Sequence, residues 1–199
     1  GLDGGKGLVL ERDGALKAYL LYAVQDQKVI CTETVYTGPL ELLAMVAALC
    51  HEQKQAEVIE LSLPVDDRSH LLLLDGRKSC FLEPFDMLRV IDFKRLLESL
   101  VFPKEAVGQF VFEVTDAQAP WNEGVWGLDI AEGKAAVTRL AGGQVDVKLS
   151  IGAVAQLVSG VIPVSDLQAM RTISCKDDVC LAALKKAFPS QRPYILEMY

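Results

Sequence analysis

Apolar and polar residues are arranged along the first 36 positions as three short apolar runs separated by turn sequences. The pattern predicts strands over residues 7–11, 16–24 and 28–36. The intervening sequences, Arg12-Asp13-Gly14 and Asp26-Gln27, are typical of tight turns. We therefore expect an antiparallel meander of three strands.

Helical and strand patterns then follow one another as far as residue 91. We expect a helix over residues 39–54, because Pro39 suits the first helical position. Its apolar residues recur at helical spacing: Leu40, Leu43, Ala44 and Ala47. A strand over 57–63, a short helix over 66–74 and a strand over 85–91 complete this half.

A second set of elements begins at Asp92, which can cap a helix that carries Phe93, Leu96, Leu97 and Leu100 on one face. Four strand patterns follow, over residues 109–115, 126–130, 135–140 and 145–149. The change in pattern places a domain boundary between about Val90 and Phe102. We assign residues 1–93 to one domain and residues 94–199 to another.

The period of the apolar positions changes at Ser150, from two to nearly four, so that a strand leads directly into a helix. Ser150 can cap that helix, and Gly160 can end it in a left-handed conformation. A second helix is expected to begin at Ser165, where Ser-Asp-Leu-Gln is a capping-box pattern. A last helix covers residues 177–188, and the apolar tail over residues 192–199 is expected to dock.

The composition is that of a globular protein, with 199 residues, 51% hydrophobic and 24% charged. A net charge of −7 argues against nucleic acid or an anionic membrane as a partner and weakly favours a cationic one. No apolar run approaches the roughly 20 residues of a membrane span, and no signal peptide is recognisable. We expect a cytoplasmic protein, and the start at Gly1 suggests a piece of a longer chain.

The five cysteines are scattered: Cys31, Cys50, Cys80, Cys175 and Cys180. Reduced, mostly buried thiols are the expected state. Cys175 and Cys180 lie five positions apart and could instead form a local bridge or a reactive pair, so their redox state stays open. With His51 and His70 as the two histidines, no close-spaced zinc ligand set can be drawn, and no metal site is expected.

The element order of the first half is that of the back half of the GNAT acetyltransferase fold. GNAT enzymes carry an Arg/Gln-x-x-Gly-x-Gly/Ala turn between the third of these strands and the long helix, where backbone amides hold the pyrophosphate of acetyl-CoA. This chain has Tyr36-Thr37-Gly38-Pro39-Leu40-Glu41 there, with one glycine, no basic residue and an acidic side chain in the first turn. We therefore expect GNAT-like order without a cofactor site.

The whole chain resembles the C-terminal part of the Eis-like (enhanced intracellular survival) N-acetyltransferases. The resemblance rests on residues 110–116, on residues 122–128 with Trp126, on residues 146–157 and on the aromatic-ended tail. It implies an α+β protein, in which a degenerate GNAT-like mixed sheet with helices is followed by a sterol-carrier-protein-like α/β sandwich.

Family members also have a catalytic N-terminal GNAT domain that binds acetyl-CoA, and their terminal carboxylate acts as general base toward the amine. By resemblance, the Tyr199 carboxylate has that role here, although a docked apolar terminus explains the same residues. This chain alone should be inactive and hold no cofactor. The implied partners are the missing N-terminal GNAT domain, an amine that could be polycationic, and further copies in a homo-oligomer.

Two other functions remain open. A sterol-carrier-like module could bind a lipid or another apolar ligand in a groove lined by Trp126, Leu157, Leu167 and Phe188. A tight core made by these residues would exclude a ligand, and large aromatic residues in strands are more often core. A purely structural or interaction domain is the third possibility. The sequence identifies neither the amine nor the oligomeric state.

Overall fold

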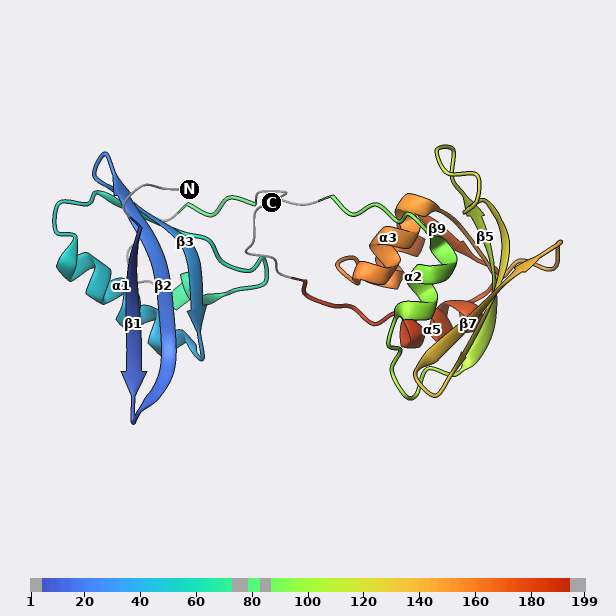
Figure 1. The fold of residues 1–199 in the computed structure, drawn as a ribbon, viewed down its shortest axis with the longest axis horizontal. Coiled ribbons are helices and arrows are strands. Elements are labelled where there is room, and N and C mark those ends of the chain that lie inside the picture. Colours follow the sequence, from blue (N-terminus) through green and yellow to red (C-terminus); the bar gives the residue numbers. More distant parts are fainter. Residues whose placement is uncertain (1–4, 73–78, 83–86, 194–199) are drawn as a thin grey trace. The chain divides into compact units, whose positions relative to one another are not determined.

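The computed structural model describes residues 5–72, 79–82 and 87–193, which form two compact units (Figure 1). The first unit contains the described residues up to Leu82, and the second runs from Met87 to Pro193. Each unit is a β-sheet with helices packed on it, so the α+β class expected from the sequence is confirmed. The domain limits at residues 1–93 and 94–199 remain a prediction.

The first unit opens with the expected antiparallel meander, formed by β1 (Lys6–Arg12), β2 (Ala15–Gln25) and β3 (Lys28–Tyr36). Its turns contain residues with positive φ, namely Asp13 at 55° and Gly14 at 71° in the first, and Asp26 at 45° and Gln27 at 64° in the second. Two such residues are typical of two-residue hairpin turns, whose twist matches that of the strands. The local sequence was therefore sufficient to position all three strands.

Helix α1 (Pro39–Glu52) follows, with proline at its first turn as expected, but its buried face differs from the prediction. Leu42, Met45 and Leu49 are buried against the sheet, whereas Leu40 is 71% exposed. Both faces of this helix are apolar, so residue spacing alone could not identify the face that packs. The helix returns the chain to β4 (Val58–Leu61), which pairs with β3 in parallel.

The end of the first half was predicted less well. A 3₁₀ turn, η1 (Ser69–Leu72), replaces part of the expected helix over residues 66–74, and residues 73–78 lie outside the description. Residues 87–91 of the expected strand over 85–91 form no strand. The Ile91 carbonyl instead accepts hydrogen bonds from the side chains of Trp121 and Asn122. At Ile91, which itself belongs to the second unit, side chains of the same unit therefore take the place of a strand partner.

The second unit is built on a five-stranded sheet. Its strands are β5 (Gly108–Thr115), β6 (Gly124–Ala131), β7 (Lys134–Leu140), β8 (Val147–Ser150) and β9 (Ile173–Cys175). Their order in the sheet is β7-β6-β5-β8-β9. The sequence indicated the first four strands and missed β9, whose three residues are too few for a periodic pattern.

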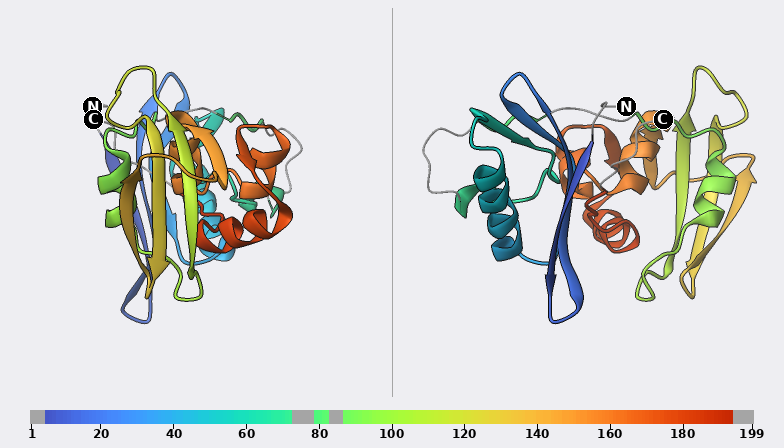
Figure 2. Two further views of the ribbon diagram at one scale, coloured as in Figure 1. Left: turned by 90° about the vertical axis from the view of Figure 1, so that its right-hand side faces the viewer. Right: turned by 60° about the vertical axis from the view of Figure 1, so that its left-hand side comes forward.

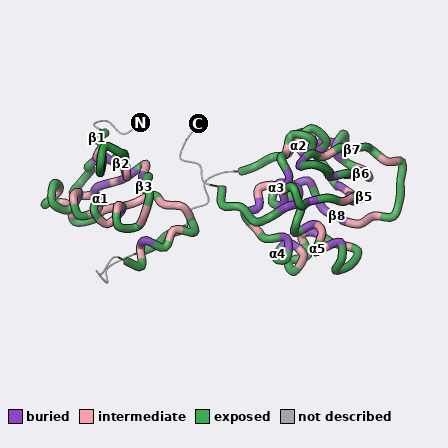
Figure 3. The backbone as a smooth tube through the Cα atoms, turned by 90° about the horizontal axis from the view of Figure 1, so that it is seen from below, coloured by how far each residue is buried: buried purple, intermediate pink, exposed green. Residues whose placement is uncertain are grey.

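Four helices cover one face of this sheet (Figure 2). They are α2 (Phe93–Ser99), α3 (Ile151–Ser159), α4 (Val164–Ala169) and α5 (Asp178–Ala187). The expected caps are present at the starts of α2 and α3, because Asp92 and Ser150 each accept a bond from a first-turn amide, and Asp177 caps α5 in the same way. Buried residues gather where the helices meet the strands (Figure 3).

The capping box expected at Ser165 is wrong. Helix α4 begins one residue earlier, at Val164, with Pro163 before it and no capping side chain. The Ser165 hydroxyl donates to the adjacent Asp166, and the Gln168 side chain accepts from the amide of Cys175. Gln168 is therefore engaged in holding β9 rather than in closing the helix start.

Candidate functional site

The N-terminus of α1 occupies the place at which a GNAT cofactor loop would be expected. The first-turn carboxylate of Glu41 lies close to Gly38, so that a Cβ added at Gly38 would be 2.8 Å from its Oε2. The Nη1 of Arg12 lies 3.5 Å from Glu41 Oε1. The positive end of the helix dipole is therefore already compensated by a side chain of the protein.

Few backbone amides remain at this helix start for an anion. Pro39 has no N–H group, and the amide of Glu41 donates to the Gly38 carbonyl at 3.1 Å. The amide of Leu42 donates to the same carbonyl at 3.3 Å. Among the described residues, the Leu40 amide is therefore the one first-turn amide without a backbone acceptor. An anion site at a helix N-terminus uses several free amides.

Strands β3 and β4 separate next to this helix start. Their pairing covers Lys28–Cys31 and Val58–Leu61, and the rest of β3 continues without β4 beside it. The hydroxyl groups of Tyr36 and Ser69 lie 3.0 Å apart and join the end of β3 to η1. Thr34 is buried on β3, and its hydroxyl has no hydrogen-bond partner among the described residues. Uncharged hydroxyl groups alone do not form a site for pyrophosphate.

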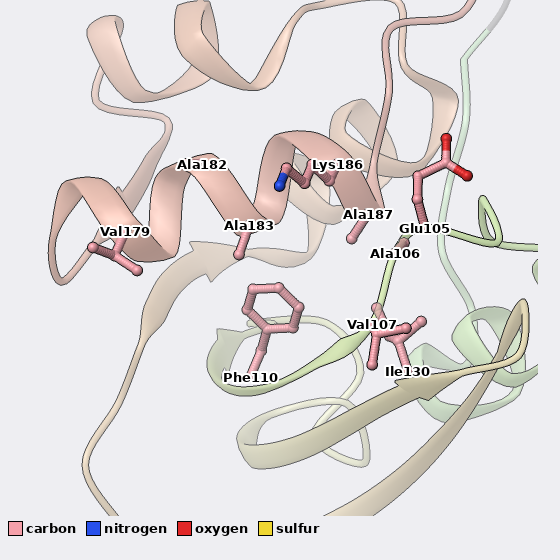
Figure 4. A pocket seen from close by; sticks show the side chains of 10 residues that line it. All are labelled: Glu105, Ala106, Val107, Phe110, Ile130, Val179, Ala182, Ala183, Lys186 and Ala187. Carbon is pink, nitrogen blue, oxygen red and sulfur yellow. The ribbon is translucent and has the colours of Figure 1, made fainter.

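A cavity of about 250 Å³ lies in the second unit between the sheet and α5 (Figure 4). Phe110 of β5 and Ile130 of β6 face Ala183 and Ala187 of α5 across it. The other lining residues are Glu105, Ala106, Val107, Val179, Ala182 and Lys186. Eight of its ten lining residues are apolar and two are charged, and it is slightly smaller than typical pockets for drug-sized ligands.

The four residues expected to line a groove are placed in the core. Trp126, Leu157, Leu167 and Phe188 are each at most 6% exposed and belong to one hydrophobic cluster. The Trp126 ring nitrogen donates to the Asn122 carbonyl at 2.9 Å, and the ring of Phe188 packs edge-on against Phe102. None of the four lines the cavity beside α5.

The cavity-lining residues were missed as site residues, because the sequence pattern marks them as core. Phe110 and Ile130 belong to the alternating apolar positions of their strands and therefore read as core. The space arises because α5 presents small side chains, Ala182, Ala183 and Ala187, where larger ones would fill it. Helical pattern alone does not distinguish a small residue that packs tightly from one that leaves a gap.

Tyr199 lies outside the described residues, so its proposed role is untested. The described chain leading toward it is anchored at Gly160, whose carbonyl accepts from the Gln191 amide at 2.8 Å and from the Ser190 hydroxyl at 3.2 Å. The segment after α5 thus leaves the second unit from a defined point.

A buried polar cluster around Asp116 was also missed from the sequence. Two hydrogen bonds of 2.7 and 2.8 Å join Arg89 Nη2 to the Asp116 carboxylate, and Asn122 donates to it at 3.0 Å. Burial raises the pKa of Asp116, but the hydrogen bonds from Arg89, Asn122 and the amides of Gln118 and Ala119 outweigh this effect and lower the pKa to about 2. Every acceptor position is used, so the cluster is structural.

The part of the chain that the structure describes contains no group of three or more residues arranged to hold a metal ion. It also contains no helix of the length and hydropathy needed to cross a membrane.

The chain is similar to several acetyltransferases. An uncharacterized N-acetyltransferase of Streptomyces avermitilis is 29% identical over 154 residues, which cover 72% of this chain and 37% of that protein. A GCN5-related N-acetyltransferase from Anabaena variabilis has the same fold, with a TM-score of 0.78 and 19% identity over 100% of this chain and 52% of the other. Eis1 from Mycobacterium abscessus aligns with a TM-score of 0.70 and 19% identity, over 99% of this chain and 51% of the other.

This chain thus spans 37% of that curated relative and about half of the solved structures it resembles. Residues 3–90 match the acetyltransferase (GNAT) domain, as the element order of the first half indicated. Residues 93–196 match the sterol carrier protein domain. The chain therefore consists of a GNAT acetyltransferase domain followed by a sterol carrier protein domain. By its second domain it belongs to the sterol carrier protein domain family.

Proposed function

We propose that this chain is the C-terminal portion of a GNAT-family N-acetyltransferase that transfers acetyl from acetyl-CoA to amines. The proposal rests on the order of the domains, a GNAT domain followed by a sterol carrier protein domain. It rests equally on the first helix, because the Glu41 carboxylate lies at its N-terminus. The relatives' names, and the share of their length that this chain spans, support the same conclusion.

In this proposal acetyl-CoA binds to a separate N-terminal GNAT domain, and this chain alone is inactive. Glu41 would lie next to the negative pyrophosphate, and Pro39 removes an amide that could bind it. A like charge this close to a phosphate disfavours binding, because the two negative charges repel each other.

The Tyr199 carboxylate would serve as the general base of the whole enzyme. A carboxylate held in a partly dry cleft has a raised pKa, which suits it to accept a proton from an attacking amine. The anchor of Ser190 and Gln191 on Gly160 supports this role, because it fixes the point from which the last eight residues extend.

The outer face of the first sheet is the surface on which we expect a partner to bind. Val9, Tyr19 and Val35 lie side by side across β1, β2 and β3, and Val9 is 58% exposed. We expect this apolar row, on the side of the sheet opposite α1, to be buried against a partner in a stable assembly. The proposed partner is the N-terminal GNAT domain. A homo-oligomer, a polycationic amine as substrate and a cytoplasmic location remain predictions.

The test measures thiol release from acetyl-CoA with a polyamine such as spermidine as acceptor. We expect turnover by the whole protein, no turnover by this chain alone, and a large loss of kcat when Tyr199 is deleted from the whole protein. Turnover by this chain alone would refute the assignment of the cofactor to another domain. An unchanged kcat after deletion of Tyr199 would refute its role as base.

The cavity beside α5 supports a second candidate, the binding of a lipid or another apolar ligand by the second unit. Ala183→Leu adds three carbons to the cavity wall and should abolish binding of a fluorescent fatty acid. The same substitution at exposed Ala44 of α1 is the control and should leave binding unchanged. Equal binding by both variants would exclude the cavity as the binding site.

A further inference from the structure

Two of the five cysteines meet in the second unit. Cys175 is the last residue of β9 and Cys180 lies in the first turn of α5, so only residues 176–179 separate the two along the chain. Both are free thiols in this structure, and both pack against the same hydrophobic cluster. No function described above uses them.

The backbone around both cysteines is held in place by Asp146. Cys175 pairs with Val147 of β8, and the next amide, that of Lys176, donates to the Asp146 carbonyl at 2.8 Å. The Cys180 thiol meets the same carbonyl at 3.5 Å. The Lys176 side chain also forms an ion pair of 2.6 Å with the Asp146 carboxylate.

The helix start fixes the second thiol. The Asp177 carboxylate accepts from the Cys180 amide at 2.7 Å, which is the N-cap bond of α5. The Cys175 amide donates to the Gln168 side chain at 3.0 Å. The backbone amides of both cysteines are therefore held by hydrogen bonds that do not involve sulfur, and these bonds can remain when the two sulfurs are joined.

We propose that Cys175 and Cys180 are a disulfide-forming pair, oxidised by a small-molecule disulfide such as glutathione disulfide. Cys175, the less buried of the two, loses its proton and attacks the disulfide, which forms a mixed disulfide and releases one glutathione thiolate. The Cys180 thiolate then attacks the Cys175 sulfur and releases the second glutathione. Two thiols lose two electrons and two protons, and one glutathione disulfide becomes two glutathione thiols.

The environment of the pair makes this reaction slow. Burial first, and then the neighbouring Cys180 and Asp177, raise the pKa of Cys175 to about 12. The thiolate that attacks is therefore scarce at neutral pH. Exposed Cys50 and Cys80 react faster with the same reagent, but each should stop at the mixed disulfide.

The bond would also affect the cavity described above. Val179 and Ala183 of α5 line that cavity, and Cys180 lies between them in the same helix. A disulfide to Cys175 would tether this wall of the cavity to the edge strand β9. When the disulfide forms, α5 is therefore covalently linked to strand β9 of the sheet.

Trypsin provides a direct test, because it cleaves after Lys176, between the two cysteines. The full chain is incubated in buffers of increasing glutathione disulfide content, remaining thiols are blocked with N-ethylmaleimide, and the digest is mapped by mass spectrometry. We expect the peptides over residues 172–176 and 177–185 to appear as one disulfide-linked species. Its yield should not depend on protein concentration.

Cys180→Ser supplies the matched control, because Cys175 should then remain as a glutathione mixed disulfide. The wild-type chain alone decides the proposal, so the result does not depend on how well the variant folds. Blocking of both Cys175 and Cys180 by N-ethylmaleimide in the most oxidising buffer would overturn it. Pairing of either residue with another cysteine, or a stable glutathione adduct on wild-type Cys175, would overturn it equally.

Discussion

Replacement of Gly160 by alanine tests how the second unit holds the segment that leads to its C-terminus. Gly160 ends α3 with φ of 67°, a left-handed conformation that costs a residue with a Cβ about 1–2 kcal/mol. An added Cβ would lie 2.8 Å from both the Gln191 nitrogen and the Pro189 oxygen. These are backbone atoms, so a side-chain rotation cannot relieve the overlap.

The segment over residues 189–191 must then move away from Gly160. The movement breaks the two hydrogen bonds that the Gly160 carbonyl accepts, from Gln191 and Ser190, each of which contributes about 1 kcal/mol. Together with the conformational cost, Gly160→Ala should lower the free energy of unfolding of the second unit by about 3–4 kcal/mol.

Urea unfolding followed by tryptophan fluorescence is the assay, because Trp121 and Trp126 are the two tryptophans of the chain and both lie in the second unit. Gly133→Ala is the matched control for conformation, since Gly133 has φ of 76° and its nearest contact is 3.2 Å away. Gly142→Ala, with nothing within 4 Å, should change stability by less than about 0.5 kcal/mol. A loss for Gly160→Ala no larger than that for Gly133→Ala would refute the argument from the close contact.

Two further predictions concern charge and surface. The pKa of Asp116 is lowered from 3.8 to about 2, so its contribution to stability is complete above pH 3.8 and is lost as the pH falls through 2. Asp116→Asn should therefore destabilise the second unit at pH 7 and flatten its loss of stability between pH 4 and 2, measured by thermal unfolding; an unchanged acid slope would contradict the cluster's role. Val9→Lys should reduce self-association of this chain in sedimentation velocity, whereas Ala44→Lys, at an exposed position of α1, should not. Equal association of the two variants would show that the outer sheet face is not the contact.

The elements that could be predicted are those whose signals are local. The meander follows from turn residues such as Gly14, and the α3 boundaries follow from Ser150 and Gly160, because each residue favours its conformation through its own backbone or side chain. The cap of α2 was recognisable for the same reason. Their prediction required no knowledge of the tertiary structure.

The features that were missed depend on distant residues. The buried face of α1 is chosen by the sheet, since Leu40 and Leu42 are equally apolar and only one is covered. Residues 87–91 of the strand expected over 85–91 form no strand, and the Ile91 carbonyl accepts from the side chains of Trp121 and Asn122 instead. The Asp116 cluster joins Arg89 to a loop 27 residues away, a pairing that no sequence spacing indicates.

Equilibrium binding of acetyl-CoA to this chain tests the central claim most directly. Isothermal titration calorimetry should give no measurable binding at millimolar acetyl-CoA, because Glu41 and Pro39 remove the anion site at α1. The whole protein, titrated in parallel, should bind one acetyl-CoA per chain. Saturable binding to this chain alone, lost on substitution in the Gly38–Glu41 turn, would contradict the account and place the cofactor in the described GNAT domain.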